Sequence, residues 1–318
     1  MRLAPEIKSK IDALWNKFWS GGMSNPLQSI EQMSYLIFMK RLEDMDVQEV
    51  KRAKAIGSDY SSVFSGKEEC RWSNWKHYPA EQMLEHVRDK VFPFIKNLHD
   101  GEKSLFAQHM KDAVFIIPKP SLLQEAVSLI DEMEITKQNA DTQGDIYEYL
   151  LSQLSTAGKN GQFRTPRHII NMMVNLVDPD INDRICDPAC GTAGFLIGAY
   201  EHILIKYTSP GMLQIDEDGE AHNLIGDHIT NPKHWQKLKN ETFFGYDFDS
   251  TMARISFMNM VLHGISAPRI EQKDTLSKRF EEEGKYTVVL ANPPFKGSID
   301  KSDINDKLTL GTTKTELL

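Results

Sequence analysis

The tetrapeptide Asn292-Pro293-Pro294-Phe295 combines residue types that can bind an exocyclic amine. Two consecutive prolines fix φ and lack backbone N–H groups, so the loop is stiff and its carbonyls are available as acceptors. The amide oxygen of Asn292 and the carbonyl of Pro293 can accept both N–H groups of one amine and free its lone pair for attack. Phe295 adds a flat apolar face on which a planar group can stack. The alternative is a rigid turn that ends a strand, with Phe295 in the core.

A second candidate site begins at Asp187, where a predicted strand over 184–187 ends. The sequence continues as Asp-Pro-Ala-Cys-Gly-Thr-Ala-Gly into a predicted helix over 193–207. Open α/β sheets bind ligands where a strand turns into a helix in this way, and a carboxylate there can pair with a cation or an amine. The segment has neither the Gly-Lys-Ser/Thr of a P-loop nor the spacing G-x-G-x-x-G. The alternative is a tight turn without a ligand.

Two further carboxylates follow the next predicted strands. Asp247 ends a strand over 242–247, where a nucleotide-like cofactor needs an acceptor for its ribose hydroxyls. Asp249 is then the expected N-cap of a helix over 250–263. Asp274 follows a strand candidate over 269–272, although a turn residue is an equally good interpretation. Asp247 and Asp249 can also both be simple caps.

The order of elements that would position these residues is typical of a doubly wound α/β sheet. Strands and helices alternate from residue 184 onward, with a polar surface insertion over 208–240. The β-branched run over 286–291 predicts a parallel strand buried on both faces. Thr165 is the expected N-cap of a helix that extends to about Val177, with Pro166 at its first position.

Residues 1–150 show the helical periodicity of apolar residues instead. The stripes cover 29–45, 79–91, 121–133 and 145–154, while 56–74 is turn-like. Within these helices, Lys40 and Arg41 are expected to face water, and Ser121 is a plausible N-cap. The sequence therefore predicts a helical domain over 1–155 and a sheet domain over 156–318.

Composition limits the function further. The net charge is −8 and neither half has an excess of basic residues, so this chain alone is a poor DNA-binding module. No apolar run reaches the ~20 residues that span a bilayer, and no secretory signal is recognisable. Three cysteines are too few for a disulfide framework, which favours a reducing, cytoplasmic setting. Cys190 is interpreted as a packing residue, and the spacing of His222, His228 and His234 predicts no metal site.

The segment Asp187–Leu196 resembles the S-adenosylmethionine motif of amino-methyltransferases, and more narrowly that of the modification (methyltransferase) subunit of type I restriction–modification systems. Phe163-Arg164-Thr165-Pro166 resembles the family's Phe-x-Thr-Pro motif, which closes over the methionine end of the cofactor. Segments 144–150 and 35–41 are similar to the family's helical N-terminal region, which implies partner and DNA contacts there. The family usually has glycine at the position of Ala193, a departure that could narrow the cofactor site.

The resemblance implies an N6-adenine DNA methyltransferase with a Rossmann-like sheet, which transfers a methyl group from S-adenosylmethionine directly to a flipped adenine. The implied partners are DNA, a DNA-specificity subunit and a restriction (motor/nuclease) subunit, with no membrane contact. The implied cofactor-binding set is Phe163, Thr165, Asp187, Pro188, Gly191, Asp247 and Asp274. The implied catalytic set is Asn292, Pro293, Pro294 and Phe295.

The family's sheet has seven strands, whereas here the fourth predicted strand ends at Ala291. We therefore expect a C-terminally truncated methyltransferase sheet with an exposed apolar edge, and impaired catalysis by the isolated chain. Three alternatives stay open. Protein glutamine-N5 methylation suits the same Asn-Pro-Pro-aromatic loop. Cytosine-N4 methylation usually has Ser in place of Asn292. An assembly or regulatory module would keep the fold without the activity.

Overall fold

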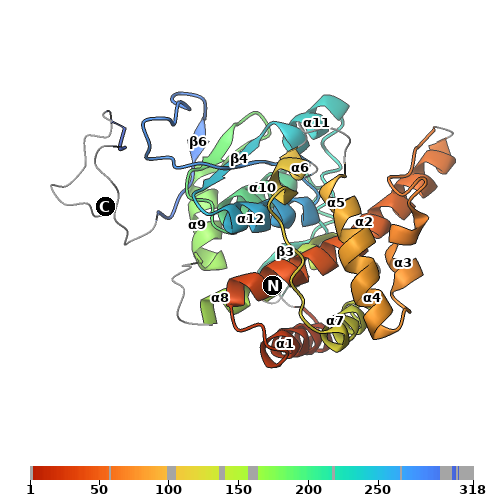
Figure 1. Cartoon of the computed structure of the whole chain (residues 1–318). Helices are drawn as coiled ribbons and strands as arrows, with labels where there is room; N and C mark the ends of the chain where they lie inside the picture. Colours follow the sequence, from red (N-terminus) through yellow and green to blue (C-terminus); the bar gives the residue numbers. More distant parts are fainter. Residues whose placement is uncertain are drawn as a thin grey trace. The chain divides into compact units, whose positions relative to one another are not determined.

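The computed structural model describes residues 3–56, 59–98, 105–135, 140–156, 164–216, 219–265, 267–293, 303–305 and 307. The chain divides into two compact units, Met1–Gly158 and Lys159–Leu318. The first is built from helices and the second carries the main sheet (Figure 1). In the described part of the chain, no helix combines the length and apolarity needed to cross a bilayer.

The first unit contains the four helical stripes expected from the sequence. Its α-helices are α1 (Pro5–Ser20), α2 (Pro26–Ile56), α3 (Trp72–Trp75), α4 (Ala80–His86), α5 (Phe92–Lys96), α6 (Leu105–Met110), α7 (Pro120–Glu132) and α8 (Ala140–Thr156). A 3-10 turn (Glu68–Cys70) precedes α3, and a π-helical turn (Val87–Val91) joins α4 to α5. The expected cap at Ser121 is wrong, because α7 begins one residue earlier at Pro120, with Lys119 in the cap position.

Helix α2 lies at the centre of this unit, where it contacts α1, α3, α7 and α8. This burial explains why the expectation that Lys40 and Arg41 face water is wrong. Lys40 is largely buried and pairs with Asp44 at 2.9 Å. Arg41 is only 8% exposed, and its Nε and Nη1 atoms have no hydrogen-bond partner. Burial lowers the pKa of the Arg41 guanidinium, and Asp44 opposes that shift.

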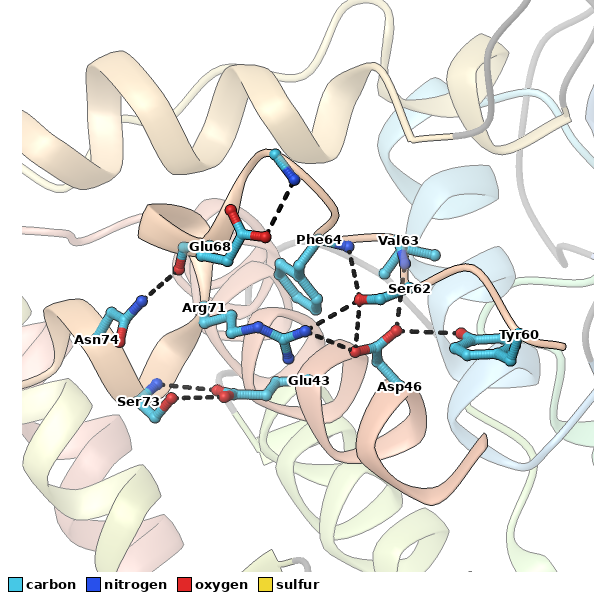
Figure 2. Close-up of polar contacts among 11 residues, drawn as sticks. Glu43, Asp46, Tyr60, Ser62, Val63, Phe64, Glu68, Arg71, Ser73 and Asn74 are labelled. Atoms are coloured by element: carbon cyan, nitrogen blue, oxygen red, sulfur yellow. Dashed lines mark hydrogen bonds and ion pairs between the residues drawn. The ribbon is translucent and has the colours of Figure 1, made fainter. Parts of the chain in front are cut away.

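The carboxylate of Asp46 on α2 joins the segment 59–75 to this helix (Figure 2). It accepts hydrogen bonds from Tyr60 Oη at 3.1 Å, Ser62 Oγ at 2.9 Å and the Val63 N–H at 3.2 Å. It also pairs with Arg71 Nη2 at 2.9 Å. Four donors on one buried carboxylate explain how a turn-like, Ser/Gly-rich segment keeps a defined conformation.

The second unit contains a parallel four-stranded sheet, in the order β5-β4-β1-β6. Its strands are β1 (Ile185–Asp187), β4 (Phe243–Asp247), β5 (Arg269–Gln272) and β6 (Val288–Val289). Helices α10 (Gly194–Lys206) and α12 (Ser250–Leu262) pack on the sheet, and α9 (Arg167–Val177) packs on α10. The 208–240 insertion contains a hairpin of β2 (Gln214–Ile215) and β3 (Ala221–His222), followed by α11 (Pro232–Asn240). The expected α/β alternation is therefore confirmed.

The last strand differs from its expected form. The run over 286–291 pairs with β1 only through Val288 and Val289, and Val289 is 58% exposed. Burial on both faces is therefore wrong for this strand. Val289 is paired with Cys186 in the register, so the two side chains lie on the same face of the sheet. On that face, Phe280 and Tyr286 pack against the buried cluster of Cys186, Phe244 and Tyr246. Since β6 is the outer strand, those side chains leave Val289 uncovered.

Candidate active site

The turn after β1 contains two residues in the left-handed region of φ. Gly191 has φ +52°, and Ala193, the residue in the N-cap position of α10, has φ +65°. The first is ordinary for glycine, whereas an alanine pays a steric cost of about 1–2 kcal/mol in this region. The side chain of Ala193 is fully buried, so this strained residue lies in the interior of the protein.

Asp187 lies at the end of β1 with a side chain that is almost completely buried. Its Oδ1 accepts a hydrogen bond from the Ala189 N–H at 3.0 Å. Burial raises the pKa of Asp187 to about 7, against the effect of that hydrogen bond and with a smaller contribution from nearby Asp247. A cationic ligand group next to this buried carboxyl would favour its charged form and so offset the effect of burial.

Asp247 ends β4 and connects that strand to the turn after β1. Its Oδ2 accepts from the Gly191 N–H at 3.1 Å, and its Oδ1 accepts from the Asp249 N–H at 2.9 Å. Burial raises the pKa of Asp247, and these backbone donors oppose the shift. Asp249 caps α12 by accepting from the Met252 N–H at 2.9 Å, which confirms its expected role.

The loop after β5 lies against the same turn. The hydroxyl of Thr275 donates to the Pro188 carbonyl at 3.0 Å. The neighbouring Asp274 accepts from the Leu276 N–H at 3.0 Å, as a turn residue does. The ends of β1, β4 and β5 are thus joined at one edge of the sheet, as expected for parallel strands.

Asn292 follows β6 and bonds to a residue far away in the sequence. Its Nδ2 donates to Thr165 Oγ1 at 3.0 Å. The expected N-cap role of Thr165 is wrong, because Pro166 takes the cap position of α9 and the Thr165 hydroxyl accepts from Asn292 instead. Pro293 is exposed to solvent. Phe163, Pro294 and Phe295 lie outside the described residues.

The register of the sheet brings the Asn292 loop and the Asp187 turn to the same edge. β6 is parallel and adjacent to β1, and the Leu290 N–H donates to the Cys186 carbonyl at 3.0 Å. Asp187 therefore ends one strand directly beside the strand that leads to Asn292. An amine bound at one strand end and a cation bound at the other would be neighbours.

Three residues near this edge were not expected from the sequence. Phe248 directly follows Asp247 and is 76% exposed, an unusual fraction for phenylalanine. On α12, Ser256 Oγ donates to the Gly191 carbonyl, and Asn259 Nδ2 donates to the Thr192 carbonyl at 2.7 Å. The available signal was a pair of polar residues, three positions apart, in the otherwise apolar run 255–262 of the helix.

Cys190 is confirmed as a packing residue, because it is buried and its pKa is raised well above that of an ordinary thiol by burial. Its Sγ lies 3.5 Å from Ser256 Oγ. Close packing also explains Gly245, where a Cβ atom would lie 2.6 Å from Ile270 Cδ1 and 3.1 Å from Cys190 Sγ. Among the residues that the structure describes, no group of three or more metal-ligating side chains is found.

Two family models match the chain. Residues 138–315 match the N-6 DNA Methylase family, and residues 7–130 match the HsdM N-terminal domain. The two matches together cover both compact units.

Individual proteins give the same result. The EcoEI type I restriction enzyme methylase subunit of Escherichia coli is 28% identical over 310 residues, which cover 94% of this chain and 57% of that protein. The EcoKI methylase subunit of Escherichia coli K12 is 24% identical over 323 residues, or 98% of this chain and 54% of that protein. This chain thus spans about half the length of the curated relatives that it matches.

Solved structures support the fold. A type I restriction–modification methyltransferase subunit from Streptococcus thermophilus superposes with a TM-score of 0.60 at 16% identity, over 92% of this chain and 65% of that one. A chain from a study of the assembly of the type I R-M system gives a TM-score of 0.65 at 25% identity, over 96% of this chain and 59% of that one.

Proposed function

The chain belongs to the N-6 DNA methylase family, and from that premise we propose that it performs adenine-N6 methylation of DNA with S-adenosylmethionine as methyl donor. The observation that carries the proposal is the adjacency of β1 and β6, whose ends present Asp187 and Asn292 at one edge of the sheet. In this arrangement a donor and an acceptor of the methyl group can meet without a covalent enzyme intermediate.

The residues at the end of β1 and β4 suit the donor. S-adenosylmethionine supplies an electrophilic methyl group on a sulfonium centre. Asp187 would pair with its ammonium group, a partner that offsets the cost of a buried carboxylate. Asp247 would accept hydrogen bonds from the ribose hydroxyls of the donor, and the exposed ring of Phe248 would cover the adenine ring of the donor. Pro188, Gly191 and Asp274 shape the loops around it, and we assign Thr165 and Phe163 to its methionine end.

The loop after β6 would hold the acceptor. Because the Nδ2 of Asn292 donates to Thr165, the Oδ1 of the same amide points away from Thr165. We propose that this oxygen and the Pro293 carbonyl accept the two N–H groups of the target adenine. Pro294 would stiffen the loop, and Phe295 would stack on the base after it leaves the duplex. The nitrogen lone pair is then free to attack the methyl carbon.

We propose that the helical domain over 1–155 makes the partner and DNA contacts, while 156–318 carries the methyl transfer. The partners would be DNA, a DNA-specificity subunit and a restriction (motor/nuclease) subunit; in support, the relatives are named as methylase subunits of type I restriction enzymes. The net charge of −8 supports a division of labour in which another subunit neutralises most of the phosphates. We place this work in the cytoplasm, in keeping with the three free cysteines.

Two measurements test the proposal. Calorimetric titration of the chain with S-adenosylmethionine should give saturable binding that Asp247→Ala abolishes; a chain that binds none would be an assembly module instead. Transfer of labelled methyl groups to adenine in DNA should occur with the specificity subunit present and should be lost in Asn292→Ala. Full activity of that variant would remove the amine-binding role. Label on cytosine would instead indicate a cytosine-N4 methyltransferase, and label on protein glutamine would indicate a glutamine-N5 methyltransferase.

A further inference from the structure

Helix α12 carries two fully buried polar side chains without charge, where apolar side chains would be expected. Ser256 and Asn259 are both fully buried. Their neighbours on the helix, such as Ile255 and Met258, are apolar and buried as well. Residues three positions apart lie on the same side of a helix, so the two polar groups form one small patch. Such burial is unfavourable unless each group makes hydrogen bonds.

Both side chains donate to backbone carbonyls of the turn after β1. Ser256 Oγ bonds to the Gly191 carbonyl, and Asn259 Nδ2 bonds to the Thr192 carbonyl at 2.7 Å. Asp247 meanwhile accepts from the Gly191 N–H at 3.1 Å. Gly191 is therefore bound through its N–H by the residue at the end of β4 and through its carbonyl by the helix that follows β4.

These bonds determine the orientation of the peptide groups in the turn. The described residues contain no cis peptide, so each N–H points opposite to the carbonyl of the same peptide group. With the Gly191 carbonyl directed at α12, the Thr192 N–H must point away from that helix. A turn with glycine at φ +52° would otherwise sample many conformations, because glycine has no Cβ to restrict it.

We propose that Ser256 and Asn259 are positioning residues, which hold the Gly191–Thr192 segment in the conformation that receives the methyl donor. Neither side chain touches the donor in this assignment; both act through the backbone of the turn. The inference rests on the proposed function, since the ligand of the turn is the donor named there. It extends the site from the strand ends to the buried side of the helix beneath them.

The central test is Ser256→Ala, which removes one hydroxyl group and creates only a small cavity. We expect the dissociation constant of S-adenosylmethionine to rise by about fivefold to tenfold, as for the loss of one hydrogen bond. The turnover number at saturating donor should change by less than about twofold, since no group at the reacting atoms is altered. An unchanged dissociation constant would overturn the inference.

Ser29→Ala is the matched control. Ser29 is also buried, and its hydroxyl donates to a backbone carbonyl, that of Met23, at 3.1 Å in the helical unit. Both variants should lower the melting temperature of the full 318-residue chain to a similar extent. Only Ser256→Ala should weaken binding of the donor. Equal weakening by both variants would reduce Ser256 to a general packing role and contradict the inference.

Hydrogen exchange of the free chain gives an independent measurement. Ser256→Ala should speed exchange in a peptide that spans 188–195, and Ser29→Ala should leave that peptide unchanged. Unaltered exchange in Ser256→Ala would overturn the inference even if the wild-type chain bound no S-adenosylmethionine. Absence of donor binding by the wild-type chain counts against the proposed function instead, so the two failures are distinguishable.

Discussion

Asn292 Nδ2 donates a hydrogen bond to Thr165 Oγ1 across 3.0 Å, and this bond joins the end of β6 to the residue that precedes the cap of α9. The two residues are 127 positions apart in the chain. The bond fixes which end of the Asn292 amide faces Thr165. In the proposed site, the Thr165 hydroxyl would thereby orient the amide that binds the amine, a role that differs from a helix cap.

Thr165→Val should therefore lower the rate of methyl transfer even at saturating donor, beyond any loss of donor affinity at the methionine end. The variant keeps the shape of the side chain but cannot accept from Asn292, so the amide loses its fixed orientation. We expect kcat for DNA adenine methylation to fall about tenfold, which corresponds to a loss of about 1.4 kcal/mol. Thr165→Ser retains the hydroxyl and should stay within about threefold of wild type. The assay is labelled methyl transfer with the specificity subunit present, and equal rates for the two variants would contradict this role.

Donor binding should depend on pH through Asp187. The pKa of this carboxyl is about 7 in the free chain, and a cationic partner would lower it, so binding below pH 7 must release a proton. The dissociation constant should rise by up to about tenfold for each pH unit below 7. Titration calorimetry between pH 5.5 and 7.5, in two buffers of different ionisation enthalpy, measures both the affinity and the proton release. Affinity that is constant across this range would rule out Asp187 as the partner of the cation.

The same carboxyl should make the free chain less stable at neutral pH than at acidic pH. Its pKa is raised in the folded state, so the folded chain binds more protons than the unfolded chain between about pH 4 and 7. The free energy of unfolding must then fall as pH rises through this range. Asp187→Asn removes the effect, so its stability relative to wild type should increase by about 2–3 kcal/mol from pH 5 to pH 8. Urea unfolding at the two pH values measures this difference, and parallel pH profiles for the two proteins would disprove it.

Arg41 and Arg71 should respond in opposite ways to replacement by methionine. Arg41 is buried, and two of its nitrogens have no partner, whereas Arg71 pairs with the buried carboxylate of Asp46 (Figure 2). Arg41→Met should leave stability unchanged or raise it by up to about 2 kcal/mol, because a buried charge with two unsatisfied nitrogens is removed. Arg71→Met should cost about 3 kcal/mol, since it leaves Asp46 buried without its cation. Denaturant unfolding of both variants decides, and a larger loss in Arg41→Met would show that its guanidinium is stabilised.

Ala193 should accept glycine far better than valine. At φ +65° the alanine methyl is strained, but it is also buried, so its removal relieves one cost and loses about 0.8 kcal/mol of apolar burial. Ala193→Gly should therefore change stability by less than about 1 kcal/mol and retain donor affinity. Ala193→Val places a β-branched side chain in the same conformation and should cost more than about 2 kcal/mol. Thermal unfolding ranks the stabilities of wild type and the two variants. A valine variant as stable as wild type would show that the backbone at Ala193 is not strained.

Much of the site could be predicted from sequence because its signals are local. Asp187 and Asp247 are the last residues of strands whose apolar patterns are visible in a few residues, and Asp249 caps the helix that it precedes. The alternation of strands and helices likewise follows from short-range periodicity. These features depend on neighbours within one or two turns of the chain, so the residue types alone specify them.

Tertiary structure decided the rest, because it depends on which distant segments become neighbours. Thr165 is a good N-cap by its type, yet a strand end more than a hundred residues away takes its hydroxyl. Arg41 is buried by helices that pack around α2, and Val289 is exposed because β6 is the outer strand. The hydrogen bonds of Ser256 and Asn259 depend on the turn against which α12 packs, and this turn lies far away in the sequence. The order of strands and the packing of helices are set by the sum of many weak contacts across the chain, and no short segment contains that sum.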